Sequence, residues 1–115
     1  MKNKLCPYCN SFIELKDSKV VYGKSYGLIY ICSNFPKCDA YVGVHKGTEK
    51  PLGSLASRYL RGLRNECHKK FDTKWEDRKE RKEAYKWLQS SMGLNKQKAH
   101  FAKFNEEQCV EFLEL

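Results

Sequence analysis

Two closely spaced pairs of cysteines lie within the first 38 residues of the chain. Cys6 and Cys9 are separated by two residues, Cys32 and Cys38 by five, and 22 residues lie between the pairs. A structural zinc ion takes four ligands in a tetrahedron, and paired cysteines at this spacing are frequent donors. Since all four ligands would be thiolates and none is left open for water, the pattern predicts one structural Zn²⁺. Four unrelated buried thiols are the alternative.

The cysteines favour a metal over disulfide bonds because nothing in the sequence indicates export. No run approaches the roughly 18 apolar residues that a membrane-spanning helix needs. The basic first residues lead into Cys6-Pro7 rather than into an apolar signal core. We therefore expect a cytoplasmic protein, and in a reducing compartment paired cysteines indicate a metal site.

The first 50 residues have a composition that favours short strands. Residues 12–15, 19–22 and 27–31 are predicted strands, with a turn at Gly23-Lys24-Ser25 between the last two. Below about 40 residues a domain usually needs a metal, disulfides or a partner for stability. The sequence therefore predicts a zinc-ribbon module over residues 1–50: a short antiparallel β-hairpin with two cysteine knuckles.

From residue 51 the pattern becomes helical. One helix is predicted from about Ser54 to Phe71, because its apolar residues share one arc of a helical wheel. A second would run from Trp75 to about Ser90, behind a capping box at residues 73–76. These apolar residues of the first helix share the arc: Leu52, Ala56, Tyr59, Leu60, Leu63, Cys67 and Phe71.

Two shorter helices are predicted after Gly93. One covers residues 96–102, and the other begins at Asn105 with Gln108 in the reciprocal capping position. The fold class is thus a small α+β protein. In it, the zinc ribbon is packed on a basic unit of three to four helices, residues 51–115, which shares a core with the ribbon.

The knuckles carry a family resemblance. Cys6-Pro7-Tyr8-Cys9 and the stretch from Cys32 to Cys38 with Phe35-Pro36-Lys37 resemble the zinc ribbons at the carboxyl end of bacterial type IA topoisomerases. The resemblance covers residues 4–44 and implies contact with single-stranded DNA. A glycine commonly follows the first knuckle in those ribbons, where this chain has Asn10.

A wider resemblance covers nearly the whole chain. Residues 38–45, 51–53, 67–72 and 84–88 are similar to an uncharacterised family of small zinc-finger-containing proteins of phages and prophages. That resemblance implies a phage or prophage gene and a bacterial host cell. It implies no function.

The charge of the chain favours a polyanionic partner. The formal net charge is +8, and residues 58–103 hold fourteen lysines and arginines against six acidic residues. Exposed aromatic rings beside lysines bind single strands with little sequence preference. Each ring could instead belong to the core, and the basic helix face could simply be solvated. The candidate nucleic-acid contacts are Tyr26, Phe35, Lys37, Arg58, Arg61, His68 and Lys69.

A nucleic-acid-binding protein, for DNA with weak sequence specificity, is the leading interpretation. The alternative is a protein-interaction module that modulates a host enzyme or defence protein. A small metal-dependent nuclease is a third possibility, since His45, His68, Asp72 and His100 could assemble, but the sequence has no catalytic motif of known type. Residues left open for a second metal site are Cys67, His68, His100 and Cys109. The charged run Glu76 to Glu83 is interpreted as a self-paired face, with pairs such as Asp77 and Arg81.

Overall fold

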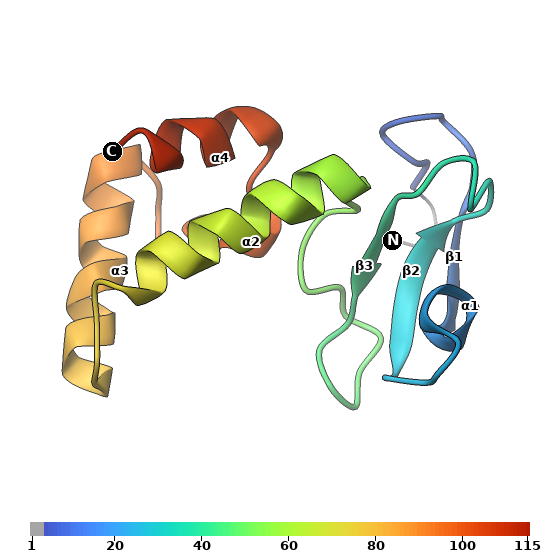
Figure 1. The fold of residues 1–115 in the computed structure, drawn as a ribbon, viewed down its shortest axis with the longest axis horizontal. Coiled ribbons are helices and arrows are strands. Elements are labelled where there is room, and N and C mark those ends of the chain that lie inside the picture. The colour runs from blue at the N-terminus through green and yellow to red at the C-terminus, as the bar shows by residue number, and fades with distance from the viewer. Residues whose placement is uncertain (1–3) are drawn as a thin grey trace. The chain divides into compact units, whose positions relative to one another are not determined.

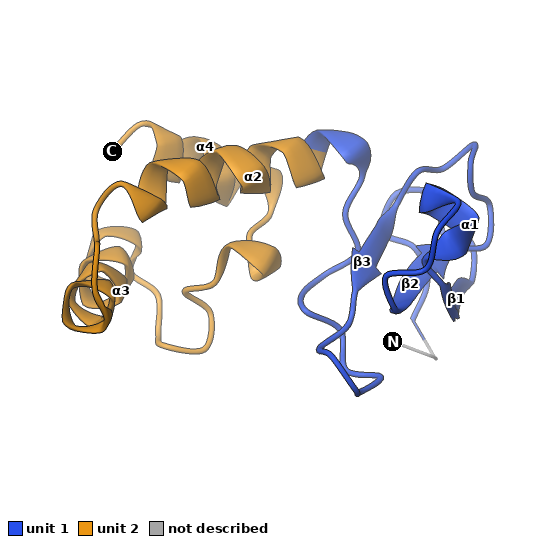
Figure 2. Ribbon diagram, turned by 60° about the horizontal axis from the view of Figure 1, so that its bottom comes forward, with its two compact units in different colours: residues 1–59 blue, residues 60–115 orange. Residues whose placement is uncertain are grey.

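The computed structural model describes residues 4–115 and divides into two compact units, residues 1–59 and 60–115 (Figure 2). The first unit contains β1 (Ile13–Asp17), α1 (Lys19–Tyr22), β2 (Leu28–Cys32), β3 (Tyr41–Gly43) and the start of α2 (Arg58–Asp72). The second contains the rest of α2, then α3 (Arg78–Met92), the short 3-10 helix η1 (Phe101–Lys103) and α4 (Glu106–Leu113). The predicted small α+β fold is confirmed.

The first unit is built around β2, which pairs in antiparallel fashion with β1 on one side and β3 on the other (Figure 1). Its last four residues are all buried, as expected for a central strand covered on both faces. Ile13 lies opposite Cys32, and Asp17 lies opposite Leu28. The register therefore places Cys32 at one end of the sheet and Leu28 at the other.

The prediction of a strand over residues 19–22 is wrong, because this segment is the one-turn helix α1. The Asp17 carboxylate accepts a hydrogen bond from the Lys19 backbone N–H at 2.9 Å, which starts a turn. Gly23 ends it in the left-handed conformation, φ 72°, and donates its N–H to the Lys19 carbonyl. These two local devices outweigh the β-favouring side chains between them.

A third strand, β3, was not predicted. Tyr30 lies opposite Val42 in the pairing of β2 with β3, and the Tyr41 and Ala56 backbones exchange two hydrogen bonds of 3.1 and 3.2 Å. Leu55, which is 3% exposed, packs into the same core. That core consists of Cys6, Tyr30, Cys32, Ala40, Val42 and Leu55, with Ile13, Leu15, Cys38 and Val44 packed against it.

α2 begins at Arg58 rather than near Ser54, and its buried face differs from the prediction. Tyr59 is 63% exposed, whereas Arg64 is only 7% exposed. Arg64 donates from Nε and Nη2 to the Phe104 carbonyl at 3.0 and 2.8 Å, and these bonds offset part of the cost of burying its guanidinium. On a helical wheel Arg64 falls beside Leu60 and Phe71, so it belongs to the buried arc of α2 although it is not among the predicted apolar residues.

α3 begins at Arg78, so the capping box predicted at residues 73–76 is wrong. Asp77 is the N-cap, and its carboxylate accepts from the Glu80 N–H at 2.8 Å. Glu80 in turn accepts from the Glu76 N–H at 2.7 Å. Because these carboxylates are engaged by the backbone, the predicted ion pair between Asp77 and Arg81 does not form among the residues described.

Phenylalanine rings form the core of the second unit. The centroid of the Phe101 ring lies 5.3, 5.0 and 4.9 Å from those of Phe71, Phe104 and Phe112. The helix predicted over residues 96–102 is wrong for most of its length, because residues 96–98 form a turn and the short 3-10 helix η1 begins only at Phe101. The predicted capping box of Asn105 and Gln108 is confirmed at the start of α4.

Lys70 of α2 supports the end of α4. Its Nζ donates to the carbonyls of Phe112, Leu113 and Leu115 at 3.2, 3.0 and 2.7 Å. A cation at the carboxyl end of a helix is favourable because the last carbonyls have no partners within the helix. Among residues 4–115, no helix is long and apolar enough to cross a membrane.

Candidate metal centre and its surroundings

The four cysteines of the two knuckles converge in space. Their sulfurs all lie within 4.8 Å of one another. The Cys6 and Cys38 sulfurs are 3.6 Å apart, and those of Cys9 and Cys32 are 3.3 Å apart. Zn–S bonds of about 2.3 Å in a tetrahedron place sulfurs about 3.8 Å apart. The donor set therefore fits one structural Zn²⁺.

The first knuckle is closed by backbone hydrogen bonds. The Asn10 N–H donates to the Cys6 carbonyl and the Cys6 N–H to the Ser11 carbonyl, both at 2.8 Å. Asn10 has φ 64°, in the left-handed region that asparagine tolerates better than other residues with a Cβ atom. Asn10 therefore occupies a backbone position of the kind that glycine otherwise favours.

The second knuckle turns tightly between Cys32 and Cys38. The Phe35 N–H donates to the Cys32 carbonyl and the Cys38 N–H to the Asn34 carbonyl, each at 3.1 Å. The Asn34 N–H also points to the Cys32 sulfur at 3.4 Å. A donor aimed at this sulfur favours its charged form, the form that binds metal.

Cys9 differs in acidity from Cys32 and Cys38. Hydrogen bonding with the side chain and backbone of Ser11 lowers the pKa of Cys9 to about 6. Burial raises the pKa of Cys32 to about 12 and raises that of Cys38 above its ordinary value. Buried thiols of this kind release their protons when a divalent cation binds to the sulfurs. The cluster is thus chemically suited to a metal, and Cys9 is its exposed member.

Fold and site together define a small α+β protein whose amino-terminal sheet carries a four-cysteine structural zinc site. The chain belongs to the zinc-finger-containing domain family (DUF3268), whose family model matches residues 2–115. Comparison with curated proteins finds no match, and comparison with solved structures finds none either.

The candidate nucleic-acid residues of the first unit lie at two ends of its sheet. Tyr26 precedes β2 and is 72% exposed, whereas Phe35 and Lys37 follow β2 in the second knuckle. The five residues of β2 separate the two groups by about 13 Å, at 3.3 Å per residue. Tyr26 therefore does not share one contact patch with Phe35 and Lys37.

The candidate residues on α2 are partly engaged within the protein. The His68 ring packs edge-on against Phe101, with centroids 4.9 Å apart. Lys69 pairs with Glu66 at 3.4 Å. Arg58 is exposed, and Arg61 is half-buried.

The open question of a second metal site has a clear geometric answer. The four knuckle cysteines are the only group of three or more potential ligands found among residues 4–115. Cys67 and Cys109 are fully buried, and the Cys67 thiol donates to the Cys109 carbonyl at 3.6 Å. Burial raises the pKa of Cys67 to about 12 and also raises that of Cys109, so both remain thiols. Neither this set nor that of His45, His68, Asp72 and His100 forms such a cluster in the described part of the chain.

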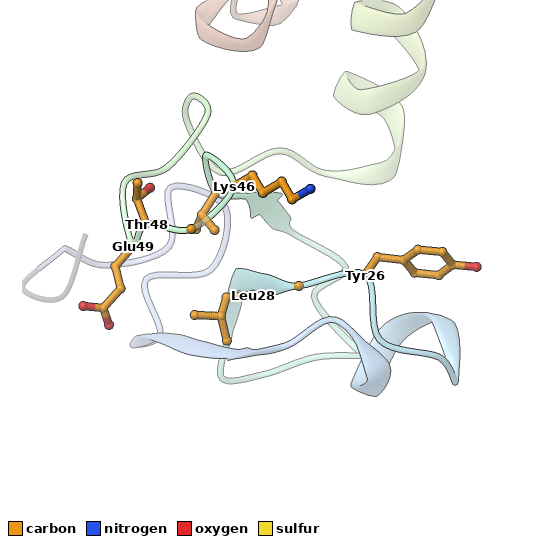
Figure 3. A pocket seen from close by; sticks show the side chains of 8 residues that line it. Tyr26, Leu28, Lys46, Thr48 and Glu49 are labelled. Carbon is orange, nitrogen blue, oxygen red and sulfur yellow. The ribbon is translucent and has the colours of Figure 1, made fainter.

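A groove beside Tyr26 is the feature that sequence reasoning did not locate. It has a volume of about 780 Å³ and lies between the start of β2 and the loop after β3 (Figure 3). Lys46, absent from the sequence-based candidates, lies across it from Leu28, and the Glu49 carboxylate points away from Lys46 (Figure 3). The lining residues are Tyr26, Gly27, Leu28, Val44, Lys46, Gly47, Thr48 and Glu49.

Proposed function

We propose that the protein binds single-stranded nucleic acid, with DNA as the expected form, through the Tyr26 groove of its zinc module and without strong base reading. The observation that carries this proposal is the ring of Tyr26, which is 72% exposed at the edge of the groove. Exposed aromatic rings stack on any base, at about 1–3 kcal/mol per base. This ring is suited to that role because it is accessible and supported.

The support for Tyr26 comes from a small aromatic cluster. The Tyr22 ring meets that of Tyr26 edge-on at 5.7 Å and that of Tyr41 at 6.0 Å. The Tyr22 hydroxyl donates to the Tyr41 hydroxyl at 3.0 Å. A ring held in this way loses less side-chain entropy when a base stacks on it.

Cations for a phosphate backbone lie near this ring. Lys24 Nζ is 5.9 Å from the centroid of the Tyr26 ring, and Lys46 lines the groove. Residues 1–59 contain nine lysines and arginines against four acidic residues. Among the described residues, neither Lys24 nor Lys46 forms an ion pair. These lysines can therefore neutralise phosphates, and binding through them weakens as salt rises.

Phe35 and Lys37 are proposed as a separate contact at the zinc end of the sheet, and Arg58, Arg61, His68 and Lys69 as phosphate contacts on α2. Replacing Arg58 and Arg61 together by alanine should weaken DNA binding with little change in melting temperature. An equal loss of fold and binding would mean that these arginines are structural.

A protein partner is the second candidate function, and one observation favours it. Leu5, Tyr8 and Phe12 are 46%, 43% and 73% exposed near the first knuckle, and Leu5 and Phe12 form a β-bridge. A set of exposed apolar side chains is a common feature of protein-binding surfaces. In this alternative, a phage or prophage protein would dock on a host enzyme or defence protein.

Fluorescence anisotropy with a labelled oligothymidylate tests the nucleic-acid proposal. Loss of one stacked base predicts that Tyr26→Ala weakens binding roughly five- to 150-fold. Tyr59→Ala is the matched control, since Tyr59 is 63% exposed and does not line the groove. The affinity of the unmodified protein should fall steeply between 50 and 200 mM salt. No binding at low salt, together with specific capture of one host protein, would instead support the protein-interaction function.

A further inference from the structure

A second cavity, lined mainly by basic residues, lies in the helical unit. It has a volume of about 540 Å³, within the range of small-molecule sites. α3 provides most of its wall, and the segment between α3 and η1 provides the rest. Four of its seven lining residues are permanently charged cations, and none is acidic. The lining residues are Arg81, Lys82, Tyr85, Lys86, Gln89, Lys96 and His100.

Two acidic residues near these cations, Asp77 and Glu80, bind backbone N–H groups at the start of the helix, as described above, and a third, Glu83, is exposed and lies outside the pocket lining. No ion pair involving the four pocket cations is found within residues 4–115. Four positive charges therefore line one small volume without an ion-pair partner in the described part of the chain.

Arg81 is held in place for a ligand. Its guanidinium carbon lies 5.6 Å from the centroid of the Trp75 ring and 5.0 Å from that of Tyr85. Tyr85 is itself packed at 4.8 Å against the buried ring of Phe71. A guanidinium that packs near aromatic rings has fewer rotamers open to it, so less entropy is lost when it binds an anion.

The rest of the pocket also suits an anion. Burial, together with the charges of Lys103 and Arg81, lowers the pKa of His100. The imidazole therefore titrates in a positive environment, which a bound anion would offset. The Gln89 side-chain amide adds a neutral hydrogen-bond donor.

We propose that this pocket binds the phosphate group of a small ligand, with Arg81 as the planar donor and Lys82, Lys86 and Lys96 as surrounding charges. Arginine suits phosphate because its N–H groups can bond two phosphate oxygens at once. The phosphate belongs either to a free nucleotide or to the end of a nucleic-acid strand. The proposal is independent of the Tyr26 groove, which lies in the other unit.

Titration of the zinc-loaded full-length protein with sodium pyrophosphate, followed by amide and side-chain NMR, tests this site. We expect saturable shifts at Gln89 and His100 and none at Tyr26. The double variant Lys82→Ala/Lys86→Ala should bind at least tenfold more weakly. Lys79→Ala/Lys98→Ala is the control, because it removes the same charge from two exposed residues outside the lining and should change affinity less than threefold.

Two further titrations identify the source of the phosphate. Adenosine triphosphate that shifts Gln89 and His100 at lower concentration than pyrophosphate would indicate a free nucleotide. A 5′-phosphorylated oligothymidylate that shifts them when its 5′-hydroxyl form does not would indicate a strand end. Absence of shifts at 10 mM pyrophosphate would overturn the proposal, as would equal affinity in the Lys82→Ala/Lys86→Ala variant. Neither result would bear on the Tyr26 groove, which is tested separately with the Tyr26→Ala variant.

Discussion

Removal of zinc should unfold the first unit and leave the second folded. Binding of a structural zinc is worth about 10–16 kcal/mol in zinc-finger peptides, whereas whole domains are stable by about 5–15 kcal/mol. Two of the six members of the first unit's core, Cys6 and Cys32, are themselves ligands, so losing the metal also disrupts packing. The second unit has its own core of phenylalanines, with no ligand cysteine in it.

Thiol counting with a chromogenic disulfide reagent measures this outcome directly. None of the six cysteines forms a disulfide bond, so each can report on its surroundings. After treatment with a strong chelator, the four ligand cysteines should react rapidly. Cys67 and Cys109 should react slowly, because both are fully buried and their raised pKa values keep them protonated. Zinc released per chain, measured with a colorimetric indicator, should equal one.

Two results would contradict this reasoning. Native mass spectrometry that finds purified, folded protein without metal would show that four sulfurs alone suffice to hold the sheet. Six rapidly reacting thiols after chelation would show that the second unit depends on the first, as the shared core expected from the sequence implies. Rapid reaction of four thiols and slow reaction of two would show that the second unit stays folded when the first unit unfolds.

Three substitutions test individual contacts through the thermal or urea unfolding of the zinc-loaded protein. Arg64→Ala should destabilise the second unit by about 1–3 kcal/mol, because the Phe104 carbonyl loses its buried donor; unchanged stability would show that water replaces the guanidinium. Asn10→Val should destabilise the first unit by about 1–2 kcal/mol, since Asn10 has φ 64°, whereas Asn10→Gly should not. Equal destabilisation by both substitutions would show that the loss of the asparagine side chain, and not the backbone conformation, is the cause. Asp77→Ala should cost about 1 kcal/mol through loss of the N-cap bond to Glu80, with reduced helix content by circular dichroism, and no change would argue that the cap is dispensable.

The zinc ligands could be predicted from the sequence because their information is local. Two short spacings and the fixed requirement of zinc for four donors are enough to select Cys6, Cys9, Cys32 and Cys38. The fourth helix could be predicted for the same reason, since Asn105 and Gln108 bond each other's backbone within one turn. No long-range contact is needed for either.

The sheet was harder to predict because its register depends on contacts between distant segments. β3 has only three residues, and in the sequence it cannot be told from the end of the second knuckle; only its pairing with β2 defines it as a strand. Likewise, Val20 and Val21 favour a strand, and the hydrogen bonds of Asp17 and Gly23 are what make this segment the helix α1. Short elements of this kind take their structure from their ends and their partners rather than from their own composition.

The net charge predicted a polyanionic partner but not its binding site, because some of the charged side chains bind groups within the protein itself. Arg64 and Lys70 look like binding residues in the sequence, yet both are used to satisfy backbone carbonyls. Conversely, Asp77 and Glu80 bind backbone N–H groups at the start of α3, and Arg81 and the lysines beside it form no ion pair in the described chain. Which basic side chains line one cavity depends on how α3 packs against the segment that follows it, so the second pocket is evident from the structure and not from the sequence.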